Sequence, residues 1–228
     1  MKLSIIIPVY NEEKTILEIL NRLMAVNFGI DYEIIVIDDG STDSTAKVIE
    51  SGIKNYESRI RVIHQEKNQG KGAALKRGFG EAVGDIIAVQ DADLEYNPQD
   101  LPKLIKPILD GRADIVYGSR FLNQHQPRYK IFYWGNRFLS WLFKLIFGQT
   151  ITDPWTGYKV FKKDCLKNIS LVSNGFELEM ELAAKFIKKG YHILELPISY
   201  QSRGYREGKK IKWLDGLKAI KTIFKYSR

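Results

Sequence analysis

The fold of this chain is decided by one stretch, Asp85-Ile86-Ile87-Ala88-Val89-Gln90-Asp91-Ala92-Asp93-Leu94-Glu95. Its short apolar run is typical of a strand that is buried on both faces of a parallel sheet. Three carboxylates follow within five residues, and they repel one another unless a cation neutralises them. Oxygen ligands of this kind suit Mg²⁺ or Mn²⁺. The stretch therefore predicts a strand that ends in a metal site, although a solvated turn would carry the same Asp-x-Asp pattern.

Similar runs on either side of this stretch are also expected to be strands, at residues 3–7, 33–37, 60–64 and 114–117. Apolar residues at helical spacing predict helices between the strands, at residues 12–26, 43–56, 70–83 and 98–109. This alternation indicates an α/β fold, a doubly wound and mostly parallel sheet with helices on both faces. Ligands of such sheets bind beyond the carboxyl ends of the strands.

The second half of the chain has a different rhythm. It predicts helices at 131–147 and 176–189, a strand at 191–197, a basic loop at 203–210 and a C-terminal amphipathic helix at 211–226. With 228 residues, 44% of them hydrophobic, the chain is expected to form a single domain. The one cysteine, Cys165, cannot form an intrachain disulfide.

Charge divides the chain into two halves. Lys and Arg number 15 against 19 Asp and Glu over residues 1–120, and 20 against 8 over residues 121–228. An acidic half can hold a metal ion, whereas a basic half attracts phosphates, anionic lipid headgroups or nucleic acid. We therefore expect residues 1–120 to bind metal and nucleotide, and residues 121–228 to meet an anionic partner.

The segment 131–147 combines many aromatic residues with cations. No stretch of the chain reaches the roughly 20 apolar residues that span a bilayer, and the N-terminus lacks the layout of a signal peptide. Trp134 and Trp141 suit the headgroup boundary of a membrane, although a core helix is the ordinary alternative for an aromatic stripe. We expect a cytoplasmic protein, peripheral on the inner face of the membrane.

Further motifs accompany the other strand ends. They are Ile6-Ile7-Pro8-Val9-Tyr10-Asn11-Glu12, the run from Val36 to Thr45, Gly70-Lys71-Gly72-Ala73-Ala74, Gly118-Ser119-Arg120 and Asp153-Pro154-Trp155-Thr156-Gly157-Tyr158-Lys159. Together with Asp91 to Glu95, and in this order, they resemble family 2 glycosyltransferases over essentially the whole chain. The branch that is most similar is the polyprenyl-phosphate glycosyltransferases, which include dolichyl-phosphate mannose and glucose synthases.

The resemblance implies a GT-A fold and a site for a GDP- or UDP-sugar. It assigns the metal, Mg²⁺ or Mn²⁺, to Asp91, Asp93 and Glu95. Donor binding is assigned to Pro8, Tyr10, Glu12, Ile37, Asp39, Lys71, Asp91, Ala92, Asp93 and Arg120. Catalysis is assigned to Asp91, Asp93, Arg120 and Asp153. Dolichyl-phosphate mannose synthases tend to have Gln at the position of Glu95 and Lys near that of Glu177, so the donor sugar stays open.

The implied reaction is the inverting transfer of a sugar to a polyprenyl phosphate at the membrane surface. A phosphate acceptor is already anionic at pH 7 and needs no general base. The residues expected to bind its phosphate come from the basic half: Arg128, Arg203, Arg206, Lys209 and Lys210.

Two other functions are compatible with the residues. A family 2 transferase that acts on a saccharide hydroxyl would use Asp153, or one of Glu177, Glu179 and Glu181, as its base. A non-enzymatic membrane- or nucleic-acid-binding module would leave the carboxylates solvated, but we expect no nucleic-acid partner. The three histidines, His64, His125 and His192, are too scattered in the sequence for a zinc site.

Overall fold

The computed structural model describes residues 1–53, 58–122, 130–204, 210 and 213–227. These residues form a seven-stranded sheet in the order β3-β2-β1-β4-β6-β5-β7. The strands are β1 (Lys2–Val9), β2 (Asp31–Asp38), β3 (Ile60–His64), β4 (Ile86–Val89), β5 (Ile115–Ser119), β6 (Lys159–Lys162) and β7 (Ile193–Pro197). The predicted mostly parallel α/β sheet is confirmed, because six strands run in one direction and β6 alone is antiparallel to its neighbours β4 and β5.

Strand β6 was not predicted from the sequence. It is four residues long, and Lys159 and Lys162 stand at its two ends. A short segment with a lysine at each end is typical of a solvent-exposed loop. In the structure, however, Lys159 is buried, with 1% of its surface exposed. The strand forms between β4 and β5, where both of its edges find hydrogen-bonding partners. Tertiary pairing therefore overrides the weak local signal.

The helices lie close to their predicted positions. They are α1 (Ile16–Met24), α2 (Thr45–Gly52), α3 (Lys71–Glu81), α4 (Leu101–Leu109), α5 (Lys130–Phe147), α6 (Leu178–Lys188) and α7 (Trp213–Lys225), with short 3₁₀ turns at Pro98–Asp100 and Lys163–Leu166. Helix α1 begins four residues later than predicted. The chain first turns at Asn11, where φ is +50°, and the Glu12 carbonyl accepts hydrogen bonds from the amides of Thr15 and Ile16. Residues 10–15, between β1 and α1, therefore lie at the edge of the sheet where β1 ends.

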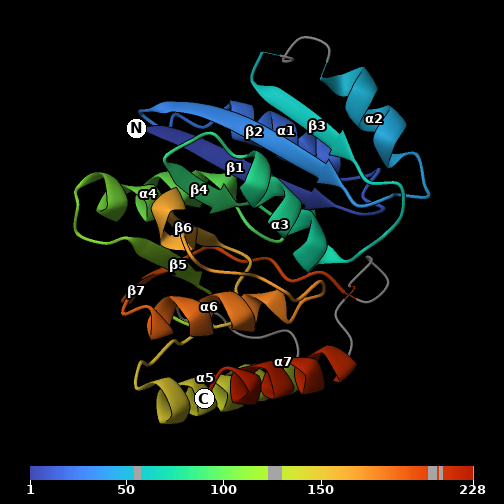
Figure 1. Ribbon diagram of the computed structural model, residues 1–228. Coiled ribbons are helices and arrows are strands. Elements are labelled where there is room, and N and C mark those ends of the chain that lie inside the picture. The colour runs from blue at the N-terminus through green and yellow to red at the C-terminus, as the bar shows by residue number, and fades with distance from the viewer. Residues whose placement is uncertain (54–57, 123–129, 205–209, 211–212, 228) are drawn as a thin grey trace.

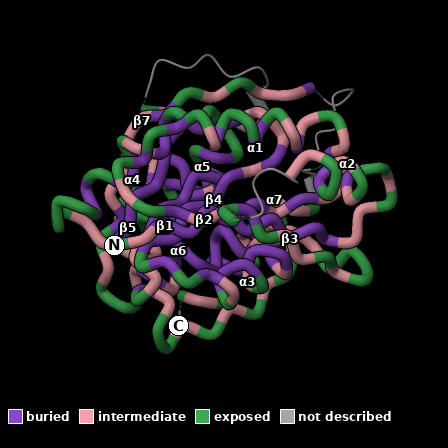
Figure 2. Tube along the Cα trace, turned by 90° about the horizontal axis from the view of Figure 1, so that it is seen from above, coloured by how far each residue is buried: buried purple, intermediate pink, exposed green. Residues whose placement is uncertain are grey.

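Helices cover both faces of the sheet (Figure 1), and the strands between them are largely buried (Figure 2). Along β1, Leu3, Ile5 and Ile7 pack into one core with α1 and α4. Ile6, between them, packs into the opposite core with residues of α3, α5, α6 and α7. This alternation is what a central strand needs, because successive side chains point to opposite faces.

Helices α5 and α7 lie side by side in an outer layer, with α6 between them and the sheet (Figure 1). The polar residues of α5 explain which side faces inward. Asn136 and Ser140 are buried, and both donate hydrogen bonds to the Thr152 carbonyl, at 2.8 and 3.0 Å. Within the described residues, no helix is long and apolar enough to cross a membrane.

Candidate active site

The predicted motifs meet at one edge of the sheet. Strands β1, β2, β4 and β5 all end there, because they point in the same direction. Strand β6 runs the opposite way, so the residues just before it, 153–158, lie at the same edge. The segment that follows β7 returns there as well, and Tyr200 forms a bridge with Tyr96. The reversal of β6 thus brings the two halves of the sequence to a common site.

Asp91 follows β4 and is paired with a buried cation. Its Oδ1 lies 2.7 Å from Nζ of Lys71, at the start of α3. Burial alone would lower the pKa of Lys71, but Asp91 and Glu179 hold that pKa well above its usual value. On its other side, Asp91 touches the loop before β6, because a Cβ at Gly157 would stand 2.2 Å from Oδ2 of Asp91. Only glycine fits here without moving the carboxylate.

Asp93 and Glu95 are held by the segment that follows β7. Oδ2 of Asp93 lies 3.0 Å from a terminal nitrogen of Arg203, and the Arg203 amide donates to Oε1 of Glu95 at 2.8 Å. The Tyr200 hydroxyl donates to the other Glu95 oxygen at 2.7 Å. Burial, together with the nearby charges of Asp91 and Glu95, raises the pKa of Asp93 to about 7, in spite of Arg203. Arg203 alone therefore does not offset the burial of Asp93 and its two neighbouring carboxylates.

Glu12 links the first strand to the C-terminal half. Its two oxygens accept hydrogen bonds from the guanidinium of Arg203, both at 3.1 Å, and Oε1 also accepts one from Lys210 at 2.8 Å. Burial alone would raise the pKa of Glu12, but these cations hold it below its usual value. Lys210 also donates to the Tyr10 carbonyl and lies 5.6 Å from the centre of the Tyr10 ring.

The five residues predicted to bind an acceptor phosphate therefore divide into two groups. Arg203 and Lys210 contact residues of the predicted donor side, and their assignment to the acceptor stays a prediction. The other three, Arg128, Arg206 and Lys209, lie outside the described residues.

The predicted nucleotide residues lie at the ends of β1 and β2. Pro8 and Ile37 are register partners across these strands. Asp39, which follows β2, accepts hydrogen bonds from the amides of Gln69 and Gly70, each at 2.8 Å, and burial raises its pKa. Asp39 thus fixes the loop that leads into α3, and the structure brings it to the same edge as Pro8 and Ile37.

Arg120 and Asp153 form a buried bidentate ion pair. Nε and a terminal nitrogen of Arg120 lie 2.7 Å from the two oxygens of Asp153, which is 0% exposed. The sequence predicted that Arg120 reaches donor phosphates and that Asp153 acts in catalysis. In the structure each is the other's ion-pair partner, and the predicted roles of both residues stay predictions.

Glu195 was missed by the sequence analysis. It lies in β7, and its carboxylate accepts hydrogen bonds from the amides of Thr152 and Asp153 at 2.7 and 3.0 Å. Burial raises its pKa. A single glutamate in an apolar strand is the signal that could have found it, since such a charge is buried only when it has partners.

A group of buried ion pairs lies behind Lys71. Glu179 of α6 is paired with Lys71 at 3.3 Å and also with Lys159 of β6. Glu181, two residues further along α6, accepts hydrogen bonds from the amides of Val172 and Ser173 and is paired with Lys185. Of the carboxylates proposed as a base for a hydroxyl acceptor, Glu179 and Glu181 are therefore occupied as structural ion pairs.

The three predicted metal ligands do not converge on one point in this structure. Among the described residues, no three Asp, Glu, His or Cys side chains are arranged to hold a metal together. Each of the three is instead bonded to a different partner: Asp91 to Lys71, Asp93 to Arg203 and Glu95 to Tyr200. His64 is bonded to Asp38, away from this group. The assignment of the metal stays a prediction.

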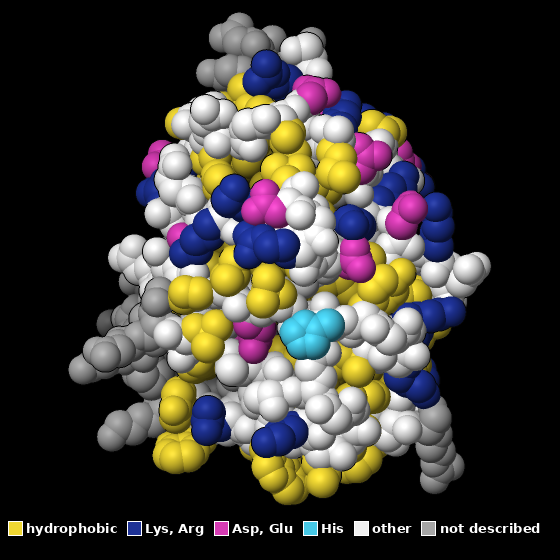
Figure 3. Space-filling model, turned by 90° about the vertical axis from the view of Figure 1, so that its left-hand side faces the viewer, with side chains coloured by type: hydrophobic (Ala, Val, Ile, Leu, Met, Phe, Trp, Pro, Cys, Tyr) yellow, Lys and Arg dark blue, Asp and Glu magenta, His cyan; other side chains and the backbone are white. Residues whose placement is uncertain are grey.

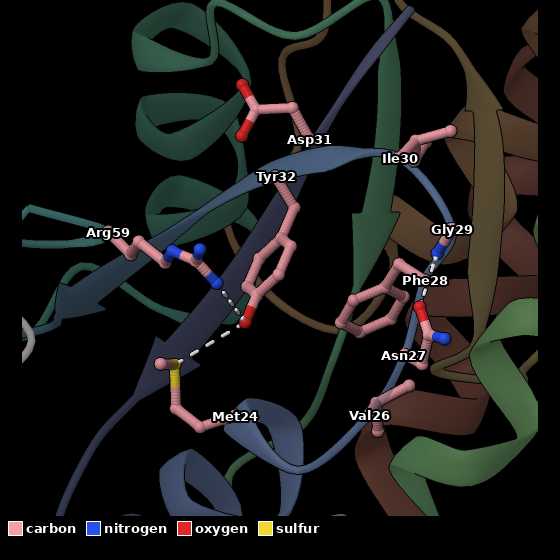
Figure 4. A pocket seen from close by; sticks show the side chains of 9 residues that line it. All are labelled: Met24, Val26, Asn27, Phe28, Gly29, Ile30, Asp31, Tyr32 and Arg59. Carbon is pink, nitrogen blue, oxygen red and sulfur yellow. Dashed lines mark hydrogen bonds between the residues drawn. The ribbon is translucent and has the colours of Figure 1, made fainter.

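A hollow of about 450 Å³ lies at the opposite end of β2, where that strand begins (Figure 4). The Tyr32 hydroxyl accepts a hydrogen bond from Arg59 at 3.2 Å and contacts the Met24 sulfur at 3.7 Å. None of the residues that were predicted to bind donor, metal or acceptor lines this hollow.

Comparison with known proteins defines the class. Residues 4–170 match the family described as glycosyl transferase family 2, and the chain belongs to that family. The chain is 34% identical over its whole length to a dolichol-phosphate mannosyltransferase of Pyrococcus furiosus, of which it spans 62%. It is 33% identical to a UDP-N-acetylglucosamine–dolichyl-phosphate N-acetylglucosaminyltransferase of Methanococcus voltae, with 85% of this chain and 83% of that protein covered.

The same fold occurs in a solved glycosyltransferase. Glucosyl-3-phosphoglycerate synthase of Mycobacterium tuberculosis, in complex with UDP, superposes with a TM-score of 0.76 at 22% identity, covering 99% of this chain and 80% of that one. Other crystals of that synthase hold Mn²⁺ or Mg²⁺ together with UDP. The predicted GT-A-type fold is confirmed.

Proposed function

We propose that this chain transfers a sugar, with inversion, from a GDP- or UDP-sugar to a polyprenyl phosphate. The observation that carries the proposal is the meeting of Asp91, Asp93 and Glu95 with Arg203 and Lys210 at one sheet edge. Carboxylates suit a metal-bound diphosphate, and the cations suit a phosphate acceptor. The names of the two curated relatives, both dolichyl-phosphate transferases, support the same acceptor class.

The carboxylates at this edge have the chemistry that a divalent metal takes, and in this structure each is bonded to another partner. They offer hard oxygen ligands, and burial, followed by the charges of Asp91 and Glu95, raises the pKa of Asp93. Asp91, Asp93 and Glu95 would hold Mg²⁺ or Mn²⁺. When bound, the metal supplies neutralisation of the charge that develops on the departing nucleoside diphosphate. Pro8 and Ile37, on adjacent strands, would meet the nucleotide, together with Tyr10.

A phosphate acceptor fits the occupied carboxylates better than a hydroxyl acceptor. Both oxygens of Asp153 are held by Arg120, and Glu179 and Glu181 are paired with lysines. A phosphate monoester needs no base, because it attacks as an anion. Guanidinium groups bind phosphates in a bidentate manner, and Arg203 would orient the acceptor in this way.

The lipid is expected to reach the site from a membrane surface on which α5 and α7 lie. Four side chains along α5 and three along α7 are large, apolar and about half or more exposed: Trp134, Phe138, Trp141, Leu145, Leu214, Leu217 and Phe224. Figure 3 shows hydrophobic side chains, with cations between them, at the end of the molecule where these helices lie. An apolar face with a cationic rim suits an anionic bilayer, such as the cytoplasmic leaflet.

The experiment is a transfer assay with a panel of GDP- and UDP-sugars, one short polyprenyl phosphate and Mn²⁺ or Mg²⁺. We expect one donor to yield a product that is extracted into organic solvent, only when metal is present. Asp93→Asn should abolish this product while the variant keeps its thermal unfolding transition. Transfer to free saccharides with no lipid product would refute the phosphate acceptor, and an active Asp93→Asn variant would refute the metal assignment.

A further inference from the structure

Arg203 holds an unusual position for a residue of the basic half. Its guanidinium bridges Glu12 and Asp93, which lie 191 and 110 residues away in the sequence. Its amide bonds Glu95 at the same time. The residue therefore contacts two of the three carboxylates that would hold a metal, and Oδ2 of Asp93 is an oxygen that both the guanidinium and a metal would use.

The contact neutralises charge that a metal would otherwise neutralise. Asp91 is balanced by Lys71, and Glu12 receives Lys210 as well as Arg203. Among the described residues, Arg203 is the one cation within ion-pair distance of Asp93. Removing the guanidinium would leave the Asp93 carboxylate buried without a counter-ion, which is costly.

The fit between Arg203 and these carboxylates is incomplete. Its Nε is buried and has no hydrogen-bond partner in the part of the chain that the structure describes. A guanidinium has five N–H donors. A phosphate offers several acceptor oxygens around one phosphorus atom, whereas a carboxylate offers only two. The present contact thus leaves the Nε donor for a different partner to satisfy.

The backbone leading to Arg203 is fixed, so the side chain can change partners alone. The Ser199 amide donates to Asp100 at 2.7 Å, and the Gln201 amide donates to the Glu95 carbonyl at 2.8 Å. The side chain of Arg203 is 17% exposed. A long, partly exposed side chain on an anchored backbone can swing toward solvent without refolding of the segment.

We propose that Arg203 is the internal counter-ion of the metal-free site, and that a divalent metal displaces its guanidinium from Asp93 and so releases it for a phosphate. This inference rests on the proposed function, because it takes Asp93 as a metal ligand. It assigns Arg203 a positioning role with two states, one on the carboxylates and one on phosphate. Metal binding and the availability of Arg203 are thereby linked.

The test measures Mn²⁺ alone, by calorimetric titration of the full chain with neither nucleotide nor lipid. Arg203→Gln removes the competitor and should bind Mn²⁺ about tenfold more tightly than wild type, since a charge-assisted bond no longer has to break. Lys210→Gln removes the same charge from Glu12 but not from Asp93, so its gain should stay under about twofold. Arg112→Gln, on an exposed pair with Asp110, serves as the distant control and should leave the affinity unchanged.

The outcomes separate the two proposals. Asp93→Asn must lose Mn²⁺ binding; if it binds as wild type does, the metal assignment fails. If Asp93→Asn loses binding but Arg203→Gln binds no more tightly than wild type, the exchange fails and the metal site stands. Equal gains for Arg203→Gln and Lys210→Gln would also overturn the exchange, because they would show a general charge effect. So would the absence of Mn²⁺ binding in every variant.

Discussion

The exposed face of α5 permits a quantitative test of membrane docking. Trp134, Phe138 and Trp141 are 67%, 49% and 57% exposed, and they follow one another at helical spacing. Their inward-facing neighbours Asn136 and Ser140 are bonded to the Thr152 carbonyl, so the helix cannot turn its aromatic face to the core without breaking those bonds. We predict that replacing the three aromatic residues by Ser removes most of the affinity of the chain for vesicles.

The magnitude follows from the exposed area. Aromatic side chains of this size bury about 150–250 Å² each, so the exposed parts of the three amount to roughly 350 Å². At about 25 cal/mol per Å², complete transfer from water would contribute about 9 kcal/mol. A helix that lies in the plane of the interface buries about half of this area. The contribution to the free energy of membrane binding is then about 4 kcal/mol, which corresponds to roughly a thousandfold change in the partition coefficient. Nearby exposed cations, such as Lys144 and Lys221, would add about 1 kcal/mol each at low salt.

The assay is cosedimentation with vesicles that contain anionic lipid, at low and high salt. Wild type should pellet, with partial release in high salt, and the triple Ser variant should stay in the supernatant. The matched control replaces Val83, Leu109 and Val172, which are also exposed but lie outside α5 and α7. The control should pellet like wild type. Equal recovery of wild type and triple variant in the supernatant would refute the reasoning and leave this face to another partner.

Three further predictions concern the site and its support. The pKa of Asp93 is raised to about 7, so Mn²⁺ must displace a proton from this carboxyl group when it binds below pH 7. The apparent affinity for Mn²⁺ should therefore fall about tenfold per pH unit below 7. An affinity that does not change between pH 5.5 and 7 would contradict this. Gly157→Ala should reduce transfer strongly with an unchanged melting temperature, because its Cβ would displace the Asp91 carboxylate; wild-type kinetics would show that Asp91 can move freely. Burial would raise the pKa of Glu181, but the hydrogen bonds of Lys185, Ser173 and the neighbouring amides hold it at about 2. Glu181→Gln should therefore lower the free energy of unfolding at pH 7 by about 2 kcal/mol, and the difference from wild type should shrink as pH falls from 4.5 toward 2; denaturant unfolding at both ends of this range measures it.

The sequence determined the parts of this protein that follow from local pattern. Apolar runs and helical spacing gave the strands and helices of the first half, because each buried face must repeat with the period of its element. The run from Asp91 to Glu95 marked one sheet edge, since parallel strands that end in carboxylates place them where ligands bind. The family also followed from the sequence, because its motifs occur in a fixed order along the chain.

Only the tertiary structure decided which charges become partners. Strand β6 has too little local signal to be predicted, yet its reversed direction brings the loop with Asp153 to the edge where Asp91 lies. Arg203 was expected on the acceptor side, and the structure adds that it bridges Glu12 and Asp93. Burial makes an unpaired charge costly, so each carboxylate takes the cation that folding places nearest, whatever the distance along the chain. Sequence patterns record spacing within an element, whereas these pairings join residues more than 100 positions apart.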